Sequence, residues 1–420
     1  MELGIIRVRQ SEALFPSLHH RKEGWLHHQE NVAKPPKPMA LSKTEPNLLK
    51  GDWPIMVNHI FVGIDLGDKN SVARIAVNRD KTERLGFVND RRGRARLFEE
   101  VKRRAEKTGE AKIVMAYEAS ACGFILRDEA EAQGIQCWVV APTKMEKSVE
   151  QRKHKNDDRD ADDLVEKLRG HVLAGNRLPT VWIPDRQMRD DREIMRTRVE
   201  LVEKQTRLKT QIQMLIKRHG LEKPSGCGAG WTIRYRRWLE ALTESDALGG
   251  GVRTALMSLL RELTFMEAEI ERIEKPIQEL AAQSRHKPII DELTQEHGVG
   301  LMTAMVYRTE IGYAGRFGRG RHVGKFVGLT HTSHESGQQN DHKGHISRQG
   351  PPRLRKMLCQ ASWVHVQHDP QAKRFYQQLV SRNPKKKKIA IVAVMRRLAV
   401  RLWHRMRQAE LRMIDLAPVN

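Results

Sequence analysis

Cysteines, aromatic side chains and long apolar runs are all scarce in this chain of 420 residues. The four cysteines lie far apart, whereas zinc sites and redox motifs need close pairs, so we expect buried thiols in a reducing cytoplasm. Aromatic residues make up only 5%, which argues against broad base-stacking surfaces. No apolar run approaches the roughly 20 residues that cross a bilayer, and the first segment lacks a signal-peptide core. We therefore expect a cytoplasmic protein with no membrane partner.

Positive charge is what the chain has in excess. Its 75 Lys and Arg outnumber 52 Asp and Glu, which gives a net charge of +23 and a pI near 10.0. Such a surface attracts polyanions, of which nucleic acid is the commonest, although a basic surface can also serve solubility alone. The length favours two or three domains.

The hydrophobic pattern changes several times along the chain. Residues 1–56 lack periodicity and predict a flexible basic extension, with Met56 as an alternative start of translation. Residues 57–183 alternate short apolar strands with amphipathic helices. Three consecutive strands favour an antiparallel meander and the later alternation favours parallel crossovers, so we expect a mixed α/β domain.

The remaining sequence is predicted to be helical. Residues 184–288 contain a heptad seam, which predicts a coiled coil within one chain or between subunits; an ordinary helical core is the alternative. Residues 289–420 are predicted to form a third, mostly helical domain, with a polar loop at 331–350. The seam consists of Val252, Leu256, Leu259, Leu263, Met266, Ile270, Ile273, Ile277 and Leu280.

Two acidic residues end apolar strands. Asp65 follows FVGI, and Glu118 ends KIVMAYE. Because an unpaired carboxylate is costly to bury, an acid in such a strand is either functional or a strand end that faces water. If the two strands are neighbours, the two acids meet at one end of a sheet.

The stretch KNDDRDADD, residues 155–163, places five aspartates at the start of a predicted helix. At about 100° per residue, Asp157 lies roughly 30° from the centre of the apolar face, and Asp160 lies one turn along on the same side. Asp163, at about 150°, should face solvent. Asp162 should face solvent too, and Asp158 is ambiguous. The apolar face comprises Ala161, Leu164, Val165 and Leu168.

Two strand acids and an i, i+3 pair from a helix form an oxygen-rich site suited to Mg²⁺ or Mn²⁺. Two such ions about 4 Å apart can polarise a phosphodiester and stabilise both the attacking and the leaving oxygen. The alternative is a solvated acidic helix start that the helix dipole stabilises. The predicted metal ligands, which are also the predicted catalytic acids, are Asp65, Glu118, Asp157 and Asp160.

The chain resembles the DEDD insertion-sequence transposases of the IS110 and IS1111 group in the order and spacing of these acids. The stretch KNDDRDA fits that group's pattern K-x-D-x-x-D-A. The resemblance covers residues 58–410 and includes GVGLMTA, RFGRGRHVGKFVGLT, SG and GHISRQGPPRLRKMLCQASW. It implies a RuvC-like (RNase H-like) amino-terminal domain, a coiled-coil region and a carboxy-terminal transposase domain. It also implies donor DNA, target DNA and a structured non-coding bridge RNA as partners.

By the same resemblance, Ser336 is the catalytic nucleophile, which becomes joined to a DNA phosphate. The residues alone leave Ser333 and Ser347 as chemically equal alternatives, because any serine hydroxyl needs a base or a metal to activate it. Since metal and serine lie in different domains, a composite site must be assembled, which favours a dimer or tetramer. The predicted nucleic-acid contacts around this loop are Lys343, Arg348, Arg353 and Arg355.

The sequence thus predicts a DNA transposase that cleaves and exchanges strands through a serine–DNA intermediate. One rival function is a hydrolytic junction resolvase that uses the same four acids with water as the nucleophile. The other is a nucleic-acid-binding protein that has descended from such an enzyme and lost catalysis.

Overall fold

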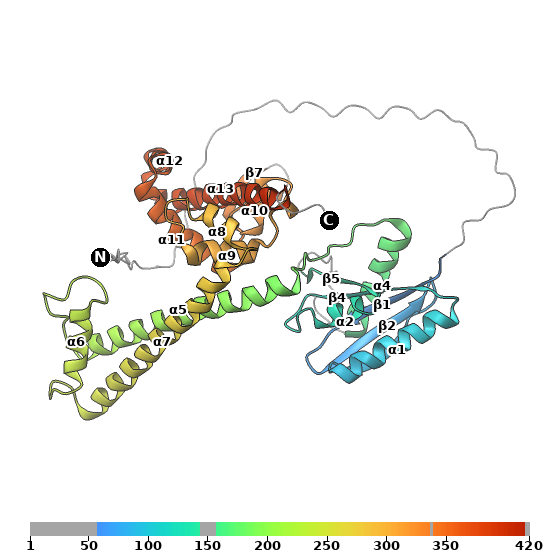
Figure 1. Ribbon diagram of the computed structural model, residues 1–420, viewed down its shortest axis with the longest axis horizontal. Coiled ribbons are helices and arrows are strands. Elements are labelled where there is room, and N and C mark those ends of the chain that lie inside the picture. The colour runs from blue at the N-terminus through green and yellow to red at the C-terminus, as the bar shows by residue number, and fades with distance from the viewer. Residues whose placement is uncertain (1–56, 143–156, 337–338, 416–420) are drawn as a thin grey trace. The chain divides into compact units, whose positions relative to one another are not determined.

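The computed structural model describes residues 57–142, 157–336 and 339–415 (Figure 1). The predicted extension, residues 1–56, lies outside the described residues. The chain divides into two compact units, one ending at Ile183 and the other beginning at Pro184. No helix within the described ranges has both the length and the apolar character that a bilayer span requires.

The amino-terminal unit is built on a five-stranded sheet with the order β3-β2-β1-β4-β5. Neighbours among β1, β2 and β3 are antiparallel, whereas β1 pairs with β4 and β4 with β5 in parallel. The predicted mixed α/β fold, a meander followed by crossovers, is confirmed. The strands are β1 (His59–Asp65), β2 (Asn70–Val77), β3 (Glu83–Val88), β4 (Lys112–Glu118) and β5 (Gln136–Val140).

Helices cover both faces of this sheet (Figure 1). Side chains alternate along a strand, so Ile60, Val62 and Ile64 of β1 pack with α1 and α2, while Phe61 packs with α4. Each face therefore has its own apolar core. The helices are α1 (Arg91–Lys107), α2 (Ile125–Glu131) and α4 (Asp157–Ala174).

Helix α4 lies unusually close to β1 at Gly63. A Cβ atom at Gly63 would lie 2.1 Å from the carbonyl oxygen of Ala161 and 2.9 Å from the backbone nitrogen of Val165. Only glycine, which has no side chain, allows the helix backbone to approach the strand this far. The predicted apolar face is confirmed, because its four residues are at most 1% exposed: Ala161, Leu164, Val165 and Leu168.

The second unit begins with a helical hairpin, in which α5 and α7 pack against each other and α6 lies near their connection (Figure 1). Leu256 and Leu263 of the predicted seam are fully buried in this hairpin. Arg198, at a polar position of the other helix, forms an ion pair of 2.6 Å with Glu274. The seam therefore joins two helices of one chain. The helices are α5 (Arg186–Arg218), α6 (Ile233–Leu242) and α7 (Gly250–Ala282).

The rest of the second unit packs around its last helix, α13. The Tyr307 hydroxyl donates to the carbonyl oxygen of Ala399 at 2.6 Å, and Trp403 Nε1 donates to that of Ala314 at 2.9 Å. The elements are α8 (Lys287–Leu293), α9 (Leu301–Ile311), α10 (Gly320–Phe326), β6 (His331–Ser336), β7 (Gln339–Ile346), α11 (Pro352–His368), α12 (Pro370–Arg382) and α13 (Lys387–Asp415).

Strands β6 and β7 correct the prediction of a polar loop at 331–350. They pair in antiparallel fashion from His331 with Ile346 to Ser336 with Gln339. Pairing satisfies the backbone N–H and C=O groups of two short polar segments even without a continuous apolar face. Periodicity alone therefore misses this hairpin.

Gly63→Ala is expected to destabilise the amino-terminal unit, because the added methyl group would collide with the α4 backbone. We expect the free energy of unfolding in urea to fall by about 1–3 kcal/mol. Gly86→Ala is the matched control, since a Cβ at Gly86 in β3 would meet only Arg84 Nη1, at 3.7 Å. Equal effects of the two substitutions would contradict the close contact between α4 and β1.

Candidate functional site

Asp65 and Glu118 lie side by side at one end of the sheet. The register of the parallel pair β1–β4 ends with Ile64 beside Tyr117, and the next residue of each strand is the acid. Both residues are half-buried. The predicted neighbourhood of the two strands therefore brings the two carboxyl groups to one sheet end.

Both acids share the sheet face that α4 covers. Because side chains alternate, Asp65 is on the same face as Phe61, and Glu118 is on the same face as Val114. Phe61 and Val114 belong to the apolar core that includes Leu164 of α4. On this face of the sheet, the two acids therefore follow directly after the apolar residues that pack against α4.

Helix α4 runs antiparallel to β1. Near its carboxyl end, Arg169 Nε donates to the carbonyl oxygen of Asn78 at 2.9 Å. Asn78 itself is bonded to His59, the first residue of β1, through its backbone nitrogen and its side chain. The amino-terminal turn of α4 therefore lies toward the other end of β1, where Asp65 is.

That first turn carries the remaining predicted ligands. Asp160 is half-buried and precedes Ala161, whose carbonyl oxygen faces Gly63, two residues before Asp65. Asp157 is the first residue of α4, and its side chain lies outside the described part of the structure. By helical spacing it is one turn before Asp160, on the same side.

Asp158 and Asp162 have a different use. Asp162 accepts from Arg74 Nε at 2.7 Å and from the Thr82 hydroxyl at 2.6 Å, and Asp158 accepts from Arg84 Nε at 2.9 Å. The hydrogen bond to Asp162 raises the pKa of Arg74. These two acids therefore attach α4 to strands β2 and β3.

The expectation that Asp162 and Asp163 face solvent is wrong in part. Asp162 is held by two partners, and Asp163 is half-buried. The prediction from helical geometry did not include the arginines of the neighbouring strands, which reach the side of the helix. The ambiguous Asp158 belongs with Asp162, since residues i and i+4 lie on one side.

The turn that follows Asp65 is held by residues whose role the sequence did not indicate. The carbonyl oxygen of Gly67 accepts a hydrogen bond from Asn89 Nδ2 at 2.8 Å. The backbone N–H of Gly67 donates to the Ser71 hydroxyl at 3.2 Å. Arg94 Nη1 donates to Asn89 Oδ1 at 3.2 Å. These contacts fix the backbone next to Asp65. No local motif indicates them, because Gly67 and Asn89 are 22 positions apart.

The predicted nucleophile lies in the second unit. Ser336 is the last residue of β6, and its side chain and that of Lys343 are outside the described part of the structure. Arg348 is exposed. Arg353 forms an ion pair with Glu200 of α5.

Arg355 has mainly internal contacts. Its Nη1 atom donates to the carbonyl oxygens of Val327, at 3.1 Å, and Gly350, at 2.9 Å. Burial lowers the pKa of Arg355. This arginine ties α11 to the segments on both sides of the β6–β7 hairpin.

The second unit also holds a cluster with metal-ligand chemistry that the sequence did not indicate. Ligand atoms of Glu296, His365 and Asp369 lie within 4.8 Å of one another. However, Arg401 Nη1 donates to both carboxylates, at 3.1 and 3.0 Å, and Arg405 Nε donates to Glu296 at 2.6 Å. Guanidinium groups thus already neutralise these acids.

Two family models match the chain. A transposase model for DEDD proteins of the IS110 type matches residues 62–220, which include all four predicted ligands. The model described as "Transposase IS116/IS110/IS902 family" matches residues 291–377, which include Ser336. The first match covers most of the amino-terminal unit and continues through α5 of the second unit, whereas the second match lies wholly in the second unit. Together they include every predicted catalytic residue.

Relatives with known names agree with these matches. "Putative transposase y4rJ" of Sinorhizobium fredii (strain NBRC 101917 / NGR234) is 30% identical over 337 residues, which cover 75% of this chain and 83% of that protein. "Putative transposase y4qE" of the same strain is 27% identical, over 73% of this chain and 71% of that protein. "Transposase for insertion sequence element IS1111A" of Coxiella burnetii is 25% identical, over 56% and 61%.

The fold agrees with these matches. The amino-terminal unit is a mixed α/β domain with two strand acids at one sheet end, and the second unit is mostly helical. The chain belongs to the IS116/IS110/IS902 family of insertion-sequence transposases.

Proposed function

We propose that this transposase cleaves and exchanges DNA strands by phosphoryl transfer that depends on a divalent metal ion. The observation that supports it most is the placement of Asp65 and Glu118 as neighbours, on the sheet face covered by α4. Asp160 lies in the first turn of that helix. We infer that these three carboxylates and that of Asp157 are the ligands.

This set of donors fits Mg²⁺ or Mn²⁺. All four groups are carboxylates, and oxygen ligands are those that these hard cations prefer. A bound ion would polarise the phosphodiester and stabilise the charge that develops on its oxygens. The protein's part is to hold the carboxylates close together: Gly63 permits the approach of α4, and Asn89 fixes the turn after Asp65.

We propose that Ser336 is the nucleophile. Its Oγ atom forms a bond to the DNA phosphorus while the bond from phosphorus to a deoxyribose oxygen breaks. The serine proton leaves to a base, and the released deoxyribose oxygen takes up a proton. Attack by the hydroxyl of another strand on the serine–DNA ester reverses these changes and joins the new strand, so no external energy source is needed.

The proposed partners are donor DNA, target DNA and a structured bridge RNA. The net charge of +23 supports binding to such large polyanions. We propose that the protein acts in the cytoplasm. The acids belong to one structural unit and Ser336 to the other. This division supports a homodimer or homotetramer in which the complete site is assembled on the nucleic acids.

A hydrolytic resolvase is the second candidate, because the acids all belong to a unit that does not contain Ser336. That unit would need only water as the nucleophile. The two candidates differ in one product: only the serine mechanism leaves protein covalently joined to DNA.

Ser336→Ala is expected to abolish the protein–DNA adduct, because no oxygen nucleophile remains at that position. The adduct is measured on denaturing gels with end-labelled DNA. Ser333→Ala, in the same strand, is the matched control and should retain the adduct. An adduct that persists in Ser336→Ala and disappears in Ser333→Ala would refute the assignment, and cleavage without any adduct would favour hydrolysis.

Asp160→Asn is expected to lower strand exchange by roughly a hundredfold or more, because a ligand of the metal ion that would stabilise charge on the reacting phosphate is lost. Its affinity for Mn²⁺, measured by electron paramagnetic resonance, should fall as well. Asp158→Asn is the control, since it removes a negative charge two positions away and loses an ion pair with Arg84 whose partners are 43% and 54% exposed. Equal losses in the two variants would rule out the proposed division of the aspartates.

A further inference from the structure

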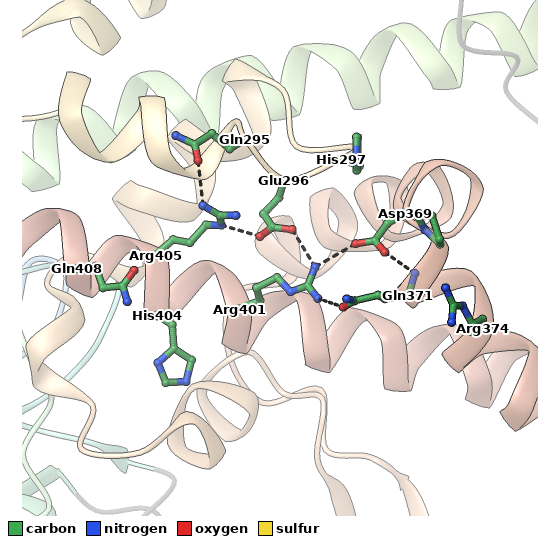
Figure 2. A pocket seen from close by; sticks show the side chains of 11 residues that line it. Gln295, Glu296, His297, Asp369, Gln371, Arg374, Arg401, His404, Arg405 and Gln408 are labelled. Carbon is green, nitrogen blue, oxygen red and sulfur yellow. Dashed lines mark hydrogen bonds and ion pairs between the residues drawn. The ribbon is translucent and has the colours of Figure 1, made fainter.

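The second unit contains a pocket whose lining side chains suit nucleic acid. None of the predicted catalytic residues lines it. It has a cavity volume of about 660 Å³ and lies between the turn after α8, the corner from α11 to α12, and α13 (Figure 2). Three arginines and two carboxylates line it, so the lining carries a net positive charge. The arginines are Arg374, Arg401 and Arg405.

The two carboxylates orient arginines, and these arginines neutralise most of the negative charge that the carboxylates would give the pocket. Glu296 and Asp369 have side chains only 5% and 12% exposed, and both accept hydrogen bonds from Arg401 Nη1. Burial by itself would lower the pKa of Arg401, but Glu296 and then Asp369 raise it overall. Arg401 is thus a fixed positive charge at the wall of the pocket.

Asp369 has a second role at the same corner. Its other oxygen accepts from the backbone nitrogens of Gln371 and Ala372 and so caps α12. Burial alone would raise its pKa, but these N–H groups and Arg401 lower it. A carboxylate with all these donors binds a further cation poorly, so a metal ion is not the ligand that this pocket favours.

Arg374 is the arginine that remains available. It is exposed on α12, lines the pocket, and forms no hydrogen bond or ion pair with another described residue (Figure 2). The contact from Arg401 Nη2 to Gln371 Oε1 is long, at 3.5 Å, and a stronger acceptor would replace it. Three glutamines add neutral donors and acceptors: Gln295, Gln371 and Gln408.

We propose that this pocket binds a nucleotide of a nucleic-acid partner, with Arg374 and Arg401 on its phosphate. Guanidinium groups bind phosphate oxygens through paired hydrogen bonds, and amide side chains suit sugar hydroxyls and base edges. The chain's excess of positive charge makes nucleic acid the polyanion that reaches this surface. The inference rests on the proposed function for its class of ligand and adds a contact site to it.

The test compares Arg374→Ala with Lys373→Ala in the full-length protein. Lys373 is the preceding residue of α12, is also exposed, and does not line the pocket. Binding of fluorescent single-stranded DNA, double-stranded DNA and RNA of one sequence is measured at several salt concentrations. Arg374→Ala should weaken binding of at least one probe by about tenfold and reduce the salt slope by about one, and the affected probe identifies the partner.

Equal losses for all three probes in Arg374→Ala and Lys373→Ala would overturn the proposal, because only general charge would then matter. Arg374→Gln, which keeps a long side chain at this exposed position, should repeat the loss. Asp65→Asn separates this inference from the proposed function. If the proposed function is right, Asp65→Asn should abolish strand exchange, and Arg374→Ala should still weaken binding in its presence. If Asp65→Asn leaves strand exchange intact, the catalytic proposal fails, and the binding result for Arg374→Ala still tests the pocket.

Discussion

The contact between helix α4 and strand β1 at Gly63 is the constraint on which the candidate site depends. With a side chain at this position, the helix would have to move away from the sheet, because a Cβ would lie 2.1 Å from a backbone oxygen. Since α4 runs antiparallel to β1, the close contact also places its first turn toward Asp65. One glycine thus links the packing of the unit to the convergence of its acids.

Electrostatic pairs then fix how α4 is rotated. Arg74 and Arg84 project from adjacent strands and hold Asp162 and Asp158. Partly exposed pairs of this kind contribute only about 0–1 kcal/mol each, so most of the packing energy comes from the apolar face. Their effect is to select one rotation of the helix. The consequence is a division of the aspartates: Asp158 and Asp162 bind arginines of β3 and β2, whereas we propose Asp160 as a metal ligand.

Much of this arrangement could be predicted from the sequence. The α/β pattern and the apolar face of α4 follow from periodicity, and the neighbouring positions of Asp65 and Glu118 follow from strand order. Partners from distant segments could not be predicted, because nothing local indicates them. The bonds of Asp162 to Arg74, of Asn89 to Gly67 and of Arg401 to Glu296 all join residues 22 to 105 positions apart. The β6–β7 hairpin was missed for a related reason, since its pairing gives no apolar period.

We propose that the carboxylates at the end of β1 and β4 hold the catalytic metal ions. A crystal structure of the full-length protein soaked in Mn²⁺, with anomalous diffraction to locate the metal, would test this proposal. We expect manganese between Asp65, Glu118 and the first turn of α4, with Asp158 and Asp162 still bound to their arginines. Manganese bound instead by Glu296, His365 and Asp369, or by Asp158 with Asp160 turned away, would contradict it.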